Sequence, residues 1–485
     1  MEMTAEVGLG IVRGISYGLF GEPGSFVPEA RALGARLVRS YLYWGQVEPR
    51  PGEYRWGVVD ALLDQLDGDE EVWLTVCASS PWATRVATDF LPPSPPKDPG
   101  AYREFVRRLV RHCGGRVAYW QCENEPSNTA LLWSGTAEEY VEQLSVLHEA
   151  VKDTDPDATV VLGGCGFDVF AGAEGSPARA FFDHVLAAGR DRFDVFSANL
   201  YGPPREVPHY LDTAERMMAA HGYRKPIFVG EHGGPVLFEF PELEPILQQV
   251  MIEAFAEAPA TQSTGELAER ARQDTPERRA LRALAGRMGE LPPRLRMFLP
   301  GCPPELENKR HRINCRQLVQ RTVLALAAGV RRTAYWNLAP EIPGPVDPNQ
   351  LMYLMFGKLP LLDYRDGRLT HRYPAAGTFA LLSGKIDGAR RVTRLDVAGP
   401  PTVTAFEVER PGRPRLLVLW DDRDTFDGED DPALPVSLPW SSATATAVDA
   451  LGTGHPVKVA DGRVHLDVSD TPVFVCEPRG QGVGS

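Results

Sequence analysis

Short runs of β-branched and aromatic residues alternate with longer amphipathic patterns over the first two-thirds of this 485-residue chain. Such alternation is typical of a parallel sheet whose strands are joined by helices. Eight strand-like runs between residues 11 and 385 predict the α/β class and a closed (β/α)8 TIM barrel with insertions. The strand-like runs are Ile15–Leu19, Arg36–Leu42, Val72–Cys77, Arg116–Cys122, Thr159–Gly163, Asp194–Leu200, Pro226–Gly230 and Arg332–Asn337. The clearest helical patterns are Ala101–Cys113, Thr136–Asp153, Ala178–Ala188 and Cys315–Ala328.

A doubly wound open sheet is the alternative fold. Such a sheet usually carries a glycine-rich phosphate loop that leads into a helix directly after its first strand. The glycines within residues 18–24 are not followed by a clear helix start, so the barrel is favoured.

The remaining segments differ in pattern from the barrel units. Residues 1–10 are predicted to form an N-terminal tail, and the barrel then occupies residues 11–385. Residues 236–312 form an insertion after the seventh strand; such a segment on the C-terminal face of a barrel would roof the mouth, with a surface decoration as the alternative. From residue 386 to 485, short β-rich runs separated by Gly, Pro and Asp predict an antiparallel β-sandwich.

The amino-acid composition and the net charge exclude several classes of protein and partner. Hydrophobic residues make up 43% and charged residues 24%, as in soluble globular proteins. The net charge of −14 disfavours nucleic acid and anionic membranes as partners. No apolar run is long enough for a transmembrane helix, and the first residues lack a secretion signal, so we expect a cytoplasmic protein. The chain is compatible with a homo-oligomer.

Cysteine and histidine patterns favour neither a disulfide framework nor a metal centre. The seven cysteines are an odd number without repeated C-x-x-C spacing, which is typical of free thiols in a reducing compartment. A pair or metal site at Cys302 and Cys315 is the less favoured alternative. The histidines show no ligand spacing such as H-x-x-x-H. We therefore expect no metal and no cofactor.

Polar residues at two strand ends carry the candidate chemistry. The fourth strand runs into Glu123-Asn-Glu125-Pro, and the seventh into Glu231-His. Side chains at the C-terminal ends of barrel strands converge on one mouth, and strands four and seven lie on opposite sides of it. Glu125 and Glu231 can therefore face each other across a ligand, as two carboxyls do in glycosidic cleavage. Strand alternation does not distinguish Glu123 from Glu125 as the acid.

The predicted second strand adds a charged residue to this mouth. Leu37, Arg39 and Tyr41 share one face of it, and Val38, Ser40 and Leu42 share the other. A charged residue in mid-strand belongs inside the barrel beside a carboxylate. Tyr201, at the end of the sixth strand, is placed to hydrogen-bond Glu231.

These motifs together resemble the retaining glycoside hydrolases of clan A, most closely family 39 and next family 5. The resemblance covers most of residues 11–385 and includes Asn-Glu-Pro at 124–126, the strand-seven glutamate and a W-x-x-x-E-P-x-x-G-x-Y-x-W segment at Trp44–Trp56. It implies that Glu125 is the general acid/base and Glu231 the nucleophile.

The resemblance also implies contacts around the two glutamates. Asn124 would hydrogen-bond the 2-hydroxyl of the reacting sugar, Arg39 would hold the nucleophile, and Trp336 would form the floor of the sugar site. The chain departs from the family at Asn199, where relatives often have histidine, and at Glu123, where they often have tryptophan. Glu123 would tune the acid, contact substrate or pair within the barrel, and these alternatives stay open.

Other residues near strand ends are weaker candidates. Sugar rings stack on indoles, so Trp44, Trp82, Trp133 and Trp336 are candidate platforms, with core packing as the alternative for each. His232 either touches substrate or supports its loop.

The sequence therefore predicts a retaining β-glycosidase that removes a terminal sugar from a small or oligomeric glycoside. Three alternatives stay open: a non-catalytic carbohydrate-binding protein on the same scaffold, an endo-acting glycanase or transglycosylase, and a metal-dependent barrel hydrolase.

Overall fold

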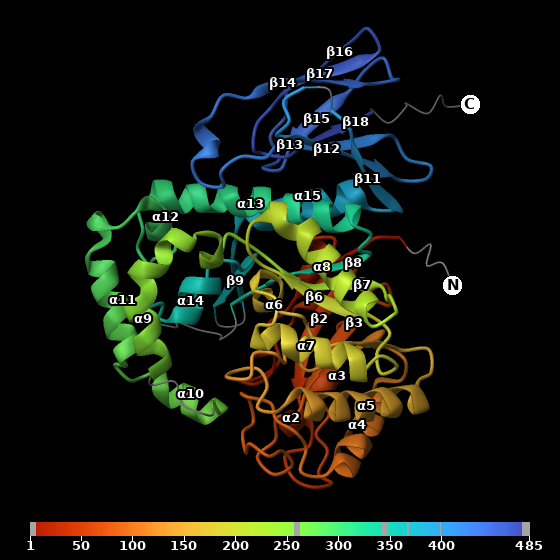
Figure 1. Cartoon of the computed structure of the whole chain (residues 1–485), viewed down its shortest axis with the longest axis vertical. Helices are drawn as coiled ribbons and strands as arrows, with labels where there is room; N and C mark the ends of the chain where they lie inside the picture. The colour runs from red at the N-terminus through yellow and green to blue at the C-terminus, as the bar shows by residue number, and fades with distance from the viewer. Residues whose placement is uncertain (1–5, 257–261, 341–346, 366–367, 398, 478–485) are drawn as a thin grey trace.

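The computed structural model describes residues 6–256, 262–340, 347–365, 368–397 and 399–477. Eight parallel strands form one sheet in the order β5-β4-β3-β2-β1-β8-β7-β6 (Figure 1). Bridges from Val161 to Val195 and from Cys165 to Ala198 join its two edges, so the sheet closes into the predicted TIM barrel. The strands are β1 Gly8–Val12, β2 Leu37–Tyr43, β3 Glu71–Cys77, β4 Tyr119–Cys122, β5 Thr159–Val161, β6 Phe196–Leu200, β7 Ile227–His232 and β8 Arg332–Tyr335.

The first strand lies earlier than predicted. It is Gly8–Val12, whereas Ile15–Leu19 forms turns at the barrel mouth. Its two glycines weakened the strand pattern. One of them, Gly10, is required because a Cβ there would come within 2.8 Å of the Leu37 side chain on β2. The segment predicted as a tail, residues 1–10, therefore contributes its last residues to the barrel, and residues 1–5 lie outside the described chain.

Helices cover the outside of the barrel. All four predicted helical patterns are helices, but the last of them begins at Pro304, so residues 304–312 belong to this helix and not to the insertion. Its first turns are dominated by charged residues, which hid the apolar period. The helices around the barrel are α1 Val27–Ala32, α2 Trp44–Val47, α3 Gly57–Leu63, α4 Pro99–Cys113, α5 Ala137–Thr154, α6 Phe167–Ala171, α7 Pro177–Ala188, α8 Val207–Ala220, α13 Pro304–Ala327 and α15 Pro374–Ile386. The 3-10 helices are η1 Pro204–Glu206, η2 Leu237–Glu239, η3 Pro241–Leu243, η4 Met288–Glu290 and η5 Gly428–Asp430.

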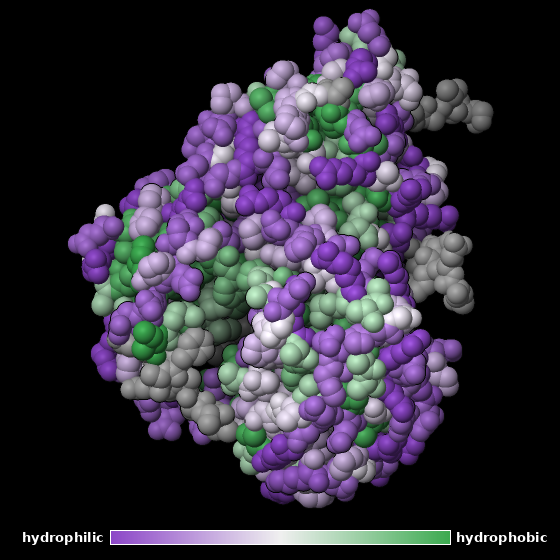
Figure 2. Space-filling model, in the orientation of Figure 1, coloured by the Kyte–Doolittle hydropathy of each residue, from purple (hydrophilic) through white to green (hydrophobic). Residues whose placement is uncertain are grey.

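The insertion after β7 forms a helical lobe beside the barrel (Figure 1). It has its own apolar core, and it reaches the loop after β3, where the Thr264 amide donates to Asp89 at 2.8 Å. Leu267 packs against the apolar cluster that fills the barrel interior and extends to its C-terminal end. The surface is hollowed between lobe and barrel (Figure 2), and residues 257–261 of the insertion lie outside the described chain. The helices of this lobe are α9 Glu244–Ala256, α10 Thr264–Arg270, α11 Pro276–Gly286 and α12 Pro293–Arg296. The helix α14 Leu351–Phe356 follows β8 and packs against α9.

The C-terminal part is an antiparallel β-sandwich, as predicted, and it rests on α13 and α15 (Figure 1). A five-stranded and a three-stranded sheet enclose a separate apolar core. A hairpin of β9 and β10 precedes the sandwich. The exact domain limits stay a prediction. The strands are β9 Leu362–Arg365, β10 Arg368–Arg372, β11 Arg391–Leu395, β12 Val403–Glu409, β13 Leu416–Asp421, β14 Leu434–Pro439, β15 Thr446–Asp449, β16 Lys458–Ala460, β17 Arg463–Val468 and β18 Val473–Cys476.

Two predictions from composition can be compared with these coordinates. All seven cysteines are free thiols, and five of them are buried, so Cys302 and Cys315 do not pair. Among the helices described, none combines the length and the apolar character that crossing a bilayer demands.

Candidate active site

A buried arginine links the ends of three barrel strands. Arg39 on β2 is fully buried, as its inward position predicted. Its Nη1 donates to Glu231 Oε1 at 2.9 Å and to the Gly230 carbonyl at 2.7 Å, and its Nη2 donates to Asn124 Oδ1 at 2.9 Å. A buried guanidinium needs such partners, because an unpaired buried charge costs several kcal/mol (~3–5). Arg39 therefore fixes Asn124 and Glu231 relative to each other.

Two tyrosines complete the surroundings of the Glu231 carboxylate. Tyr41 donates its hydroxyl to Oε1 at 2.5 Å, and Tyr201 donates to Oε2 at 2.9 Å. Burial raises the pKa of both tyrosines well above 10, so both remain protonated donors. With Arg39, both oxygens of this nearly buried carboxyl group accept hydrogen bonds, which fixes its orientation in the mouth.

Glu125 lies in a different electrostatic environment. Its pKa is raised to about 8, first by burial and second by the negative charge of Glu231. Asn199 on β6 donates to Oε1 at 2.7 Å and partly opposes this shift. A carboxyl with such a pKa is protonated at neutral pH and can give a proton to a substrate. The site therefore pairs a proton-holding carboxyl, Glu125, with a second carboxyl, Glu231, that accepts hydrogen bonds on both oxygens.

The backbone after β4 separates Glu123 from Glu125. The strand ends at Cys122, and Glu123 and Glu125 have φ values of 56° and 44°. These left-handed conformations cost about 1–2 kcal/mol each in non-glycine residues and cluster at functional sites. Strand alternation no longer applies beyond Cys122, which is why the sequence did not distinguish the two glutamates.

Glu123 points away from the mouth. It is fully buried, and its Oε1 accepts from the Ala78 amide at 2.7 Å and from Gln143 on α5 at 2.5 Å. Burial raises its pKa to about 8. The structure therefore corrects the substrate-contact interpretation: Glu123 is a buried, protonated side chain that ties the loop after β3 to a surrounding helix.

Trp336 lies where the resemblance places it, at the end of β8. Its ring packs edge-on against Tyr41, with centroids 6.5 Å apart, in the same apolar cluster as Tyr201. His232 is on the opposite face of β7 from Glu231 and packs edge-on against Tyr335 at 5.7 Å. Burial lowers the pKa of His232 to about 3, so it is neutral. Of the two predicted roles of His232, this packing favours support of its loop.

The other three tryptophans pack against the outer core, two of them fully buried and Trp82 half-buried. Trp44 is fully buried, stacks on Phe105 and donates Nε1 to the Glu48 carboxylate at 2.8 Å. Trp82 packs on Trp44 and donates to the Glu48 carbonyl at 2.8 Å. Trp133 is fully buried beside α5. The hydrogen bonds from Trp44 and Trp82 to Glu48 thus hold the loop after β2 against the outside of the barrel.

Three residues near the glutamates were not among the predicted site residues. Tyr41 shares the inner face of its strand with Arg39, so alternation could have found it. Gln121 also points inward, and it accepts from Trp73 at 3.0 Å and donates to the Glu123 carbonyl at 2.6 Å.

The third of these residues is Asp168 on α6. A Cβ at Gly166 would lie 2.7 Å from Asp168 Oδ1 and 3.2 Å from Glu125 Cδ, so both carboxyls lie beside this glycine. The charge of Asp168 raises the pKa of Glu125 further. No sequence signal marks this short helix.

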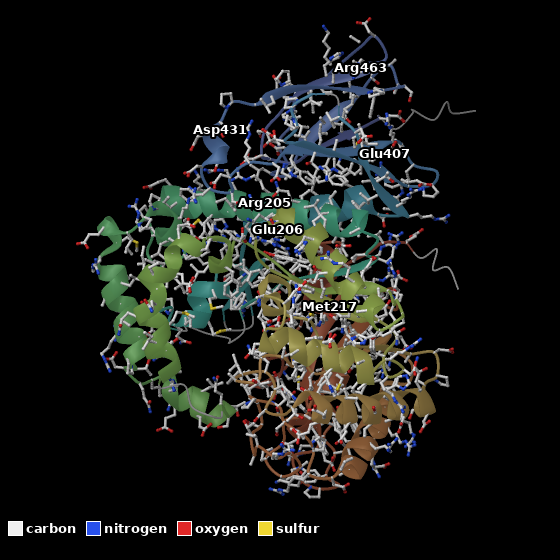
Figure 3. All side chains as sticks on the ribbon, viewed as in Figure 1. Arg205, Glu206, Met217, Glu407, Asp431 and Arg463 are labelled. Carbon is white, nitrogen blue, oxygen red and sulfur yellow. The ribbon has the colours of Figure 1, made fainter. Side chains whose placement is uncertain are left out.

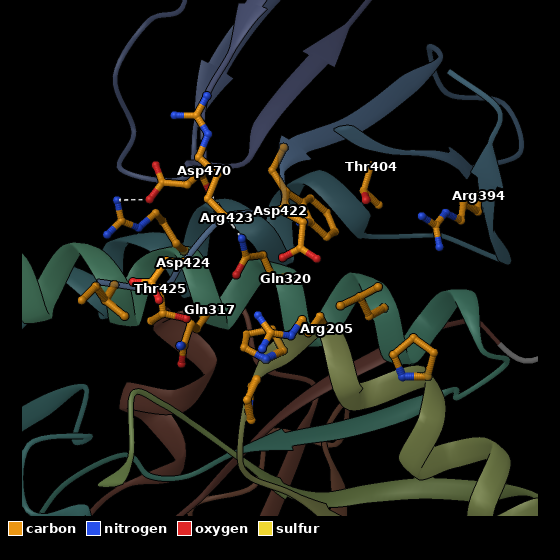
Figure 4. Close-up of a pocket in the computed structure, with 17 residues that line it drawn as sticks. Arg205, Gln317, Gln320, Arg394, Thr404, Asp422, Arg423, Asp424, Thr425 and Asp470 are labelled. Atoms are coloured by element: carbon orange, nitrogen blue, oxygen red, sulfur yellow. Dashed lines mark hydrogen bonds and ion pairs between the residues drawn. The ribbon is translucent and has the colours of Figure 1, made fainter. Parts of the chain in front are cut away.

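A second, polar pocket lies where the sandwich meets the barrel (Figure 4), near the position of Arg205 in Figure 3. Its lining includes Arg205, Gln320, Arg394, Thr404 and Asp422. Neither strand-end glutamate lines it. Over the described ranges, no group of three or more His, Cys, Asp or Glu side chains is arranged to hold a metal ion.

Comparison with known proteins shows the fold. No family model and no curated protein matches the sequence. Among solved structures, a family 39 glycoside hydrolase from Bacteroides cellulosilyticus WH2 is 14% identical with a TM-score of 0.60, covering 99% of this chain and 82% of that one. A glucosidase from Croceicoccus marinus is 13% identical with a TM-score of 0.57 over 98% and 96%. A monomeric β-xylosidase from Caulobacter crescentus CB15 is 14% identical with a TM-score of 0.55 over 98% and 100%.

Proposed function

We propose that this protein is a retaining glycoside hydrolase related to clan A, with Glu125 as acid/base and Glu231 as nucleophile. The proposal rests on one observation above all: the two carboxyls that follow β4 and end β7 lie in different surroundings. Arg39, Tyr41 and Tyr201 donate to Glu231, whereas the pKa of Glu125 is about 8. The fold shared with a glucosidase and a β-xylosidase agrees with an O-glycoside as substrate.

In the first step, a Glu231 oxygen attacks the anomeric carbon while Glu125 gives its proton to the departing glycosidic oxygen. The leaving group departs as an alcohol, and the sugar becomes an ester of Glu231. Asn124 presents its amide nitrogen to the 2-hydroxyl of the sugar, because its Oδ1 is occupied by Arg39.

In the second step, the Glu231 ester is neutral, so one cause of the raised Glu125 pKa is gone. Glu125, which gave up its proton in the first step, is therefore stabilised as a carboxylate and accepts a proton from water as the water attacks the anomeric carbon. The ester is cleaved, the sugar leaves with its original configuration, and both carboxyls return to their starting states.

We also propose that the enzyme removes a terminal sugar, since the lobe after β7 contacts the loop after β3 and packs Leu267 against the apolar cluster of the barrel interior. A closed mouth favours a pocket over an open groove. The β-linkage follows only from the resemblance. Cytoplasmic location, homo-oligomer formation and the absence of nucleic-acid and membrane partners stay predictions.

The carbohydrate-binding alternative was motivated by Asn199 and Glu123. Asn199 donates to Glu125 at 2.7 Å, and Glu123 is buried outside the mouth. Neither substitution removes a group that the two-step reaction needs, so catalysis is the better-supported function.

The test is a panel of nitrophenyl β-glycosides with Glu125→Ala, Glu231→Ala and, as control, Asp422→Asn in the junction pocket. Loss of acid/base catalysis alone is expected to lower kcat/KM by about 10²–10⁴-fold, whereas the control should match the wild type. With a dinitrophenyl glycoside, which needs no acid, azide should restore turnover in both glutamate variants. Glu125→Ala should give the β-glycosyl azide and Glu231→Ala the α-anomer.

Two results would contradict the assignment. Unchanged turnover in both variants would exclude these glutamates, and sugar binding without turnover of any glycoside would favour a binding protein. Loss of activity in a chelator would instead favour the metal-dependent alternative.

A further inference from the structure

Beside the candidate acid lies a continuous apolar surface, here called the apolar wall and formed by Phe167, Phe238, Met352 and Phe356. Phe167 directly follows Gly166, where a Cβ would lie 3.2 Å from Glu125 Cδ. The wall therefore starts next to the acid. Its members come from α6 after β5, from η2 after β7 and from α14 after β8.

Ring contacts connect the wall. Phe167 and Phe238 stack with centroids 5.3 Å apart and planes 11° from parallel. Phe238 meets Phe356 edge-on at 6.4 Å, and Phe356 meets Tyr201 edge-on at 5.4 Å. Met352 precedes Phe356 by four residues on α14, so both lie on one face of that helix.

Part of this wall faces solvent. Phe238 is 38% exposed and Met352 is 50% exposed, two of only four large hydrophobic residues that are exposed within the described chain. Leaving such surface in water is unfavourable by ~25 cal/mol per Å². Exposed apolar surface beside a polar site is typical of a ligand-binding region.

The position of the wall identifies the part of the substrate that meets it. A general acid must lie beside the oxygen of the leaving group, so the leaving group occupies the Glu125 side of the mouth. Phe167 and Phe238 stack on each other, so the ring faces between them are closed to a sugar. Phenylalanine and methionine side chains also offer no hydrogen bond to sugar hydroxyls, and burying an unpaired hydroxyl costs about 2–7 kcal/mol. An apolar group would instead be stabilised there.

We infer that the leaving group of the natural substrate is an apolar aglycone, aryl or alkyl, and not a second sugar. This inference rests on the proposed glycosidase function. It concerns only the leaving-group side and makes no statement on which sugar is removed.

The test uses four glycosides of whichever sugar the nitrophenyl panel identifies: the hexyl glycoside, the methyl glycoside, the glycosyl fluoride and the 1,4-linked disaccharide. Hexyl and methyl leaving groups have the same alcohol chemistry and differ in apolar length. The wild type should prefer hexyl over methyl by about 10-fold or more in kcat/KM, and hexyl over the disaccharide.

The decisive variant is Phe238→Ala, with Leu451→Ala on the sandwich as control, since that leucine is 39% exposed and apolar. Phe238→Ala should reduce the hexyl preference about 3- to 10-fold, with glycosyl fluoride turnover within about 2-fold of wild type. Met352→Ser, at a half-exposed position, should also reduce the preference for the hexyl glycoside. Leu451→Ala should change neither quantity.

The inference is overturned if the disaccharide is the better substrate, or if the hexyl preference is equal in the wild type and both wall variants. Those outcomes leave the glycosidase assignment intact, because the glycosyl fluoride is still hydrolysed. Failure to hydrolyse any glycoside, fluoride included, would instead contradict the proposed function.

Discussion

Replacing the candidate acid with its neutral isostere should make the protein more stable while it removes activity. Glu125 has a folded-state pKa of about 8 against an ordinary value of 4.5. Between these values the folded protein binds a proton that the unfolded chain has released. Stability therefore falls as pH rises through this window, by up to about 1.4 kcal/mol per pH unit. The variant Glu125→Gln does not show this pH-dependent loss of stability, because a glutamine side chain does not titrate.

The size of the effect follows from the width of the window. At pH values near 4.5 the variant and the wild type should differ little, because the glutamine Oε1 can still accept from Asn199. Near pH 7 the accumulated difference is about 3 kcal/mol in favour of Glu125→Gln, and it should increase up to about pH 8. Glu123, whose pKa is also about 8, is unchanged in both proteins and cancels in the comparison.

The assay is denaturant unfolding at several pH values, with Glu231→Gln as the matched control. That variant should lose stability, by about 3–5 kcal/mol, because it leaves the buried Arg39 charge without its carboxylate partner. A stability gain in Glu125→Gln that does not grow with pH, or no gain at neutral pH, would refute the claim that Glu125 is held protonated.

Three further substitutions test individual contacts. Asp168→Asn removes a negative charge that raises the Glu125 pKa, so the alkaline limb of the kcat/KM profile should move to lower pH; an unmoved limb would mean that the charge is screened. Glu123→Gln should keep kcat/KM near pH 6 within about 10-fold of wild type, since this carboxyl is already neutral there; a loss as large as that of Glu125→Gln would identify Glu123 as the acid. Tyr41→Phe removes a charge-assisted hydrogen bond to Glu231, worth about 1.5–3 kcal/mol, and should lower kcat/KM by about 10- to 100-fold, measured with the nitrophenyl substrate; wild-type turnover would show that the contact does not support the nucleophile.

Most of the barrel could be predicted because its strands are buried on both sides. Seven of the eight predicted runs overlap β2–β8, most of whose residues are apolar or β-branched. The first strand was misplaced because Gly8 and Gly10 replace the side chains that would mark it. Those glycines are explained only by the close approach of Arg332 and Leu37, which are distant in sequence.

The site was predictable where strand alternation holds and unpredictable where it ends. Arg39 and Tyr41 alternate inward on β2, and Glu231 and His232 alternate in and out on β7. The direction of the Glu123 side chain could not be predicted from the sequence, because the left-handed backbone after β4 turns it toward α5.

The tryptophans show a second limit on predicting site residues from the sequence. An aromatic residue near a strand end has the same sequence signature in a sugar platform and in the outer core. Trp44 and Trp82 are assigned to the core by their shared contacts with Glu48, which depend on the path of the loop after β2.

The central claim is that Glu231 bonds covalently to the sugar, and peptide mapping by mass spectrometry tests it most directly. The protein is incubated with a set of 2-deoxy-2-fluoro-β-glycosyl fluorides, in which the fluorine slows release of the ester more than its formation. The account predicts one sugar mass added to the peptide that contains Glu231, and no addition in Glu231→Gln. A label on another residue, or turnover of the matching glycoside with no label on any peptide, would contradict it.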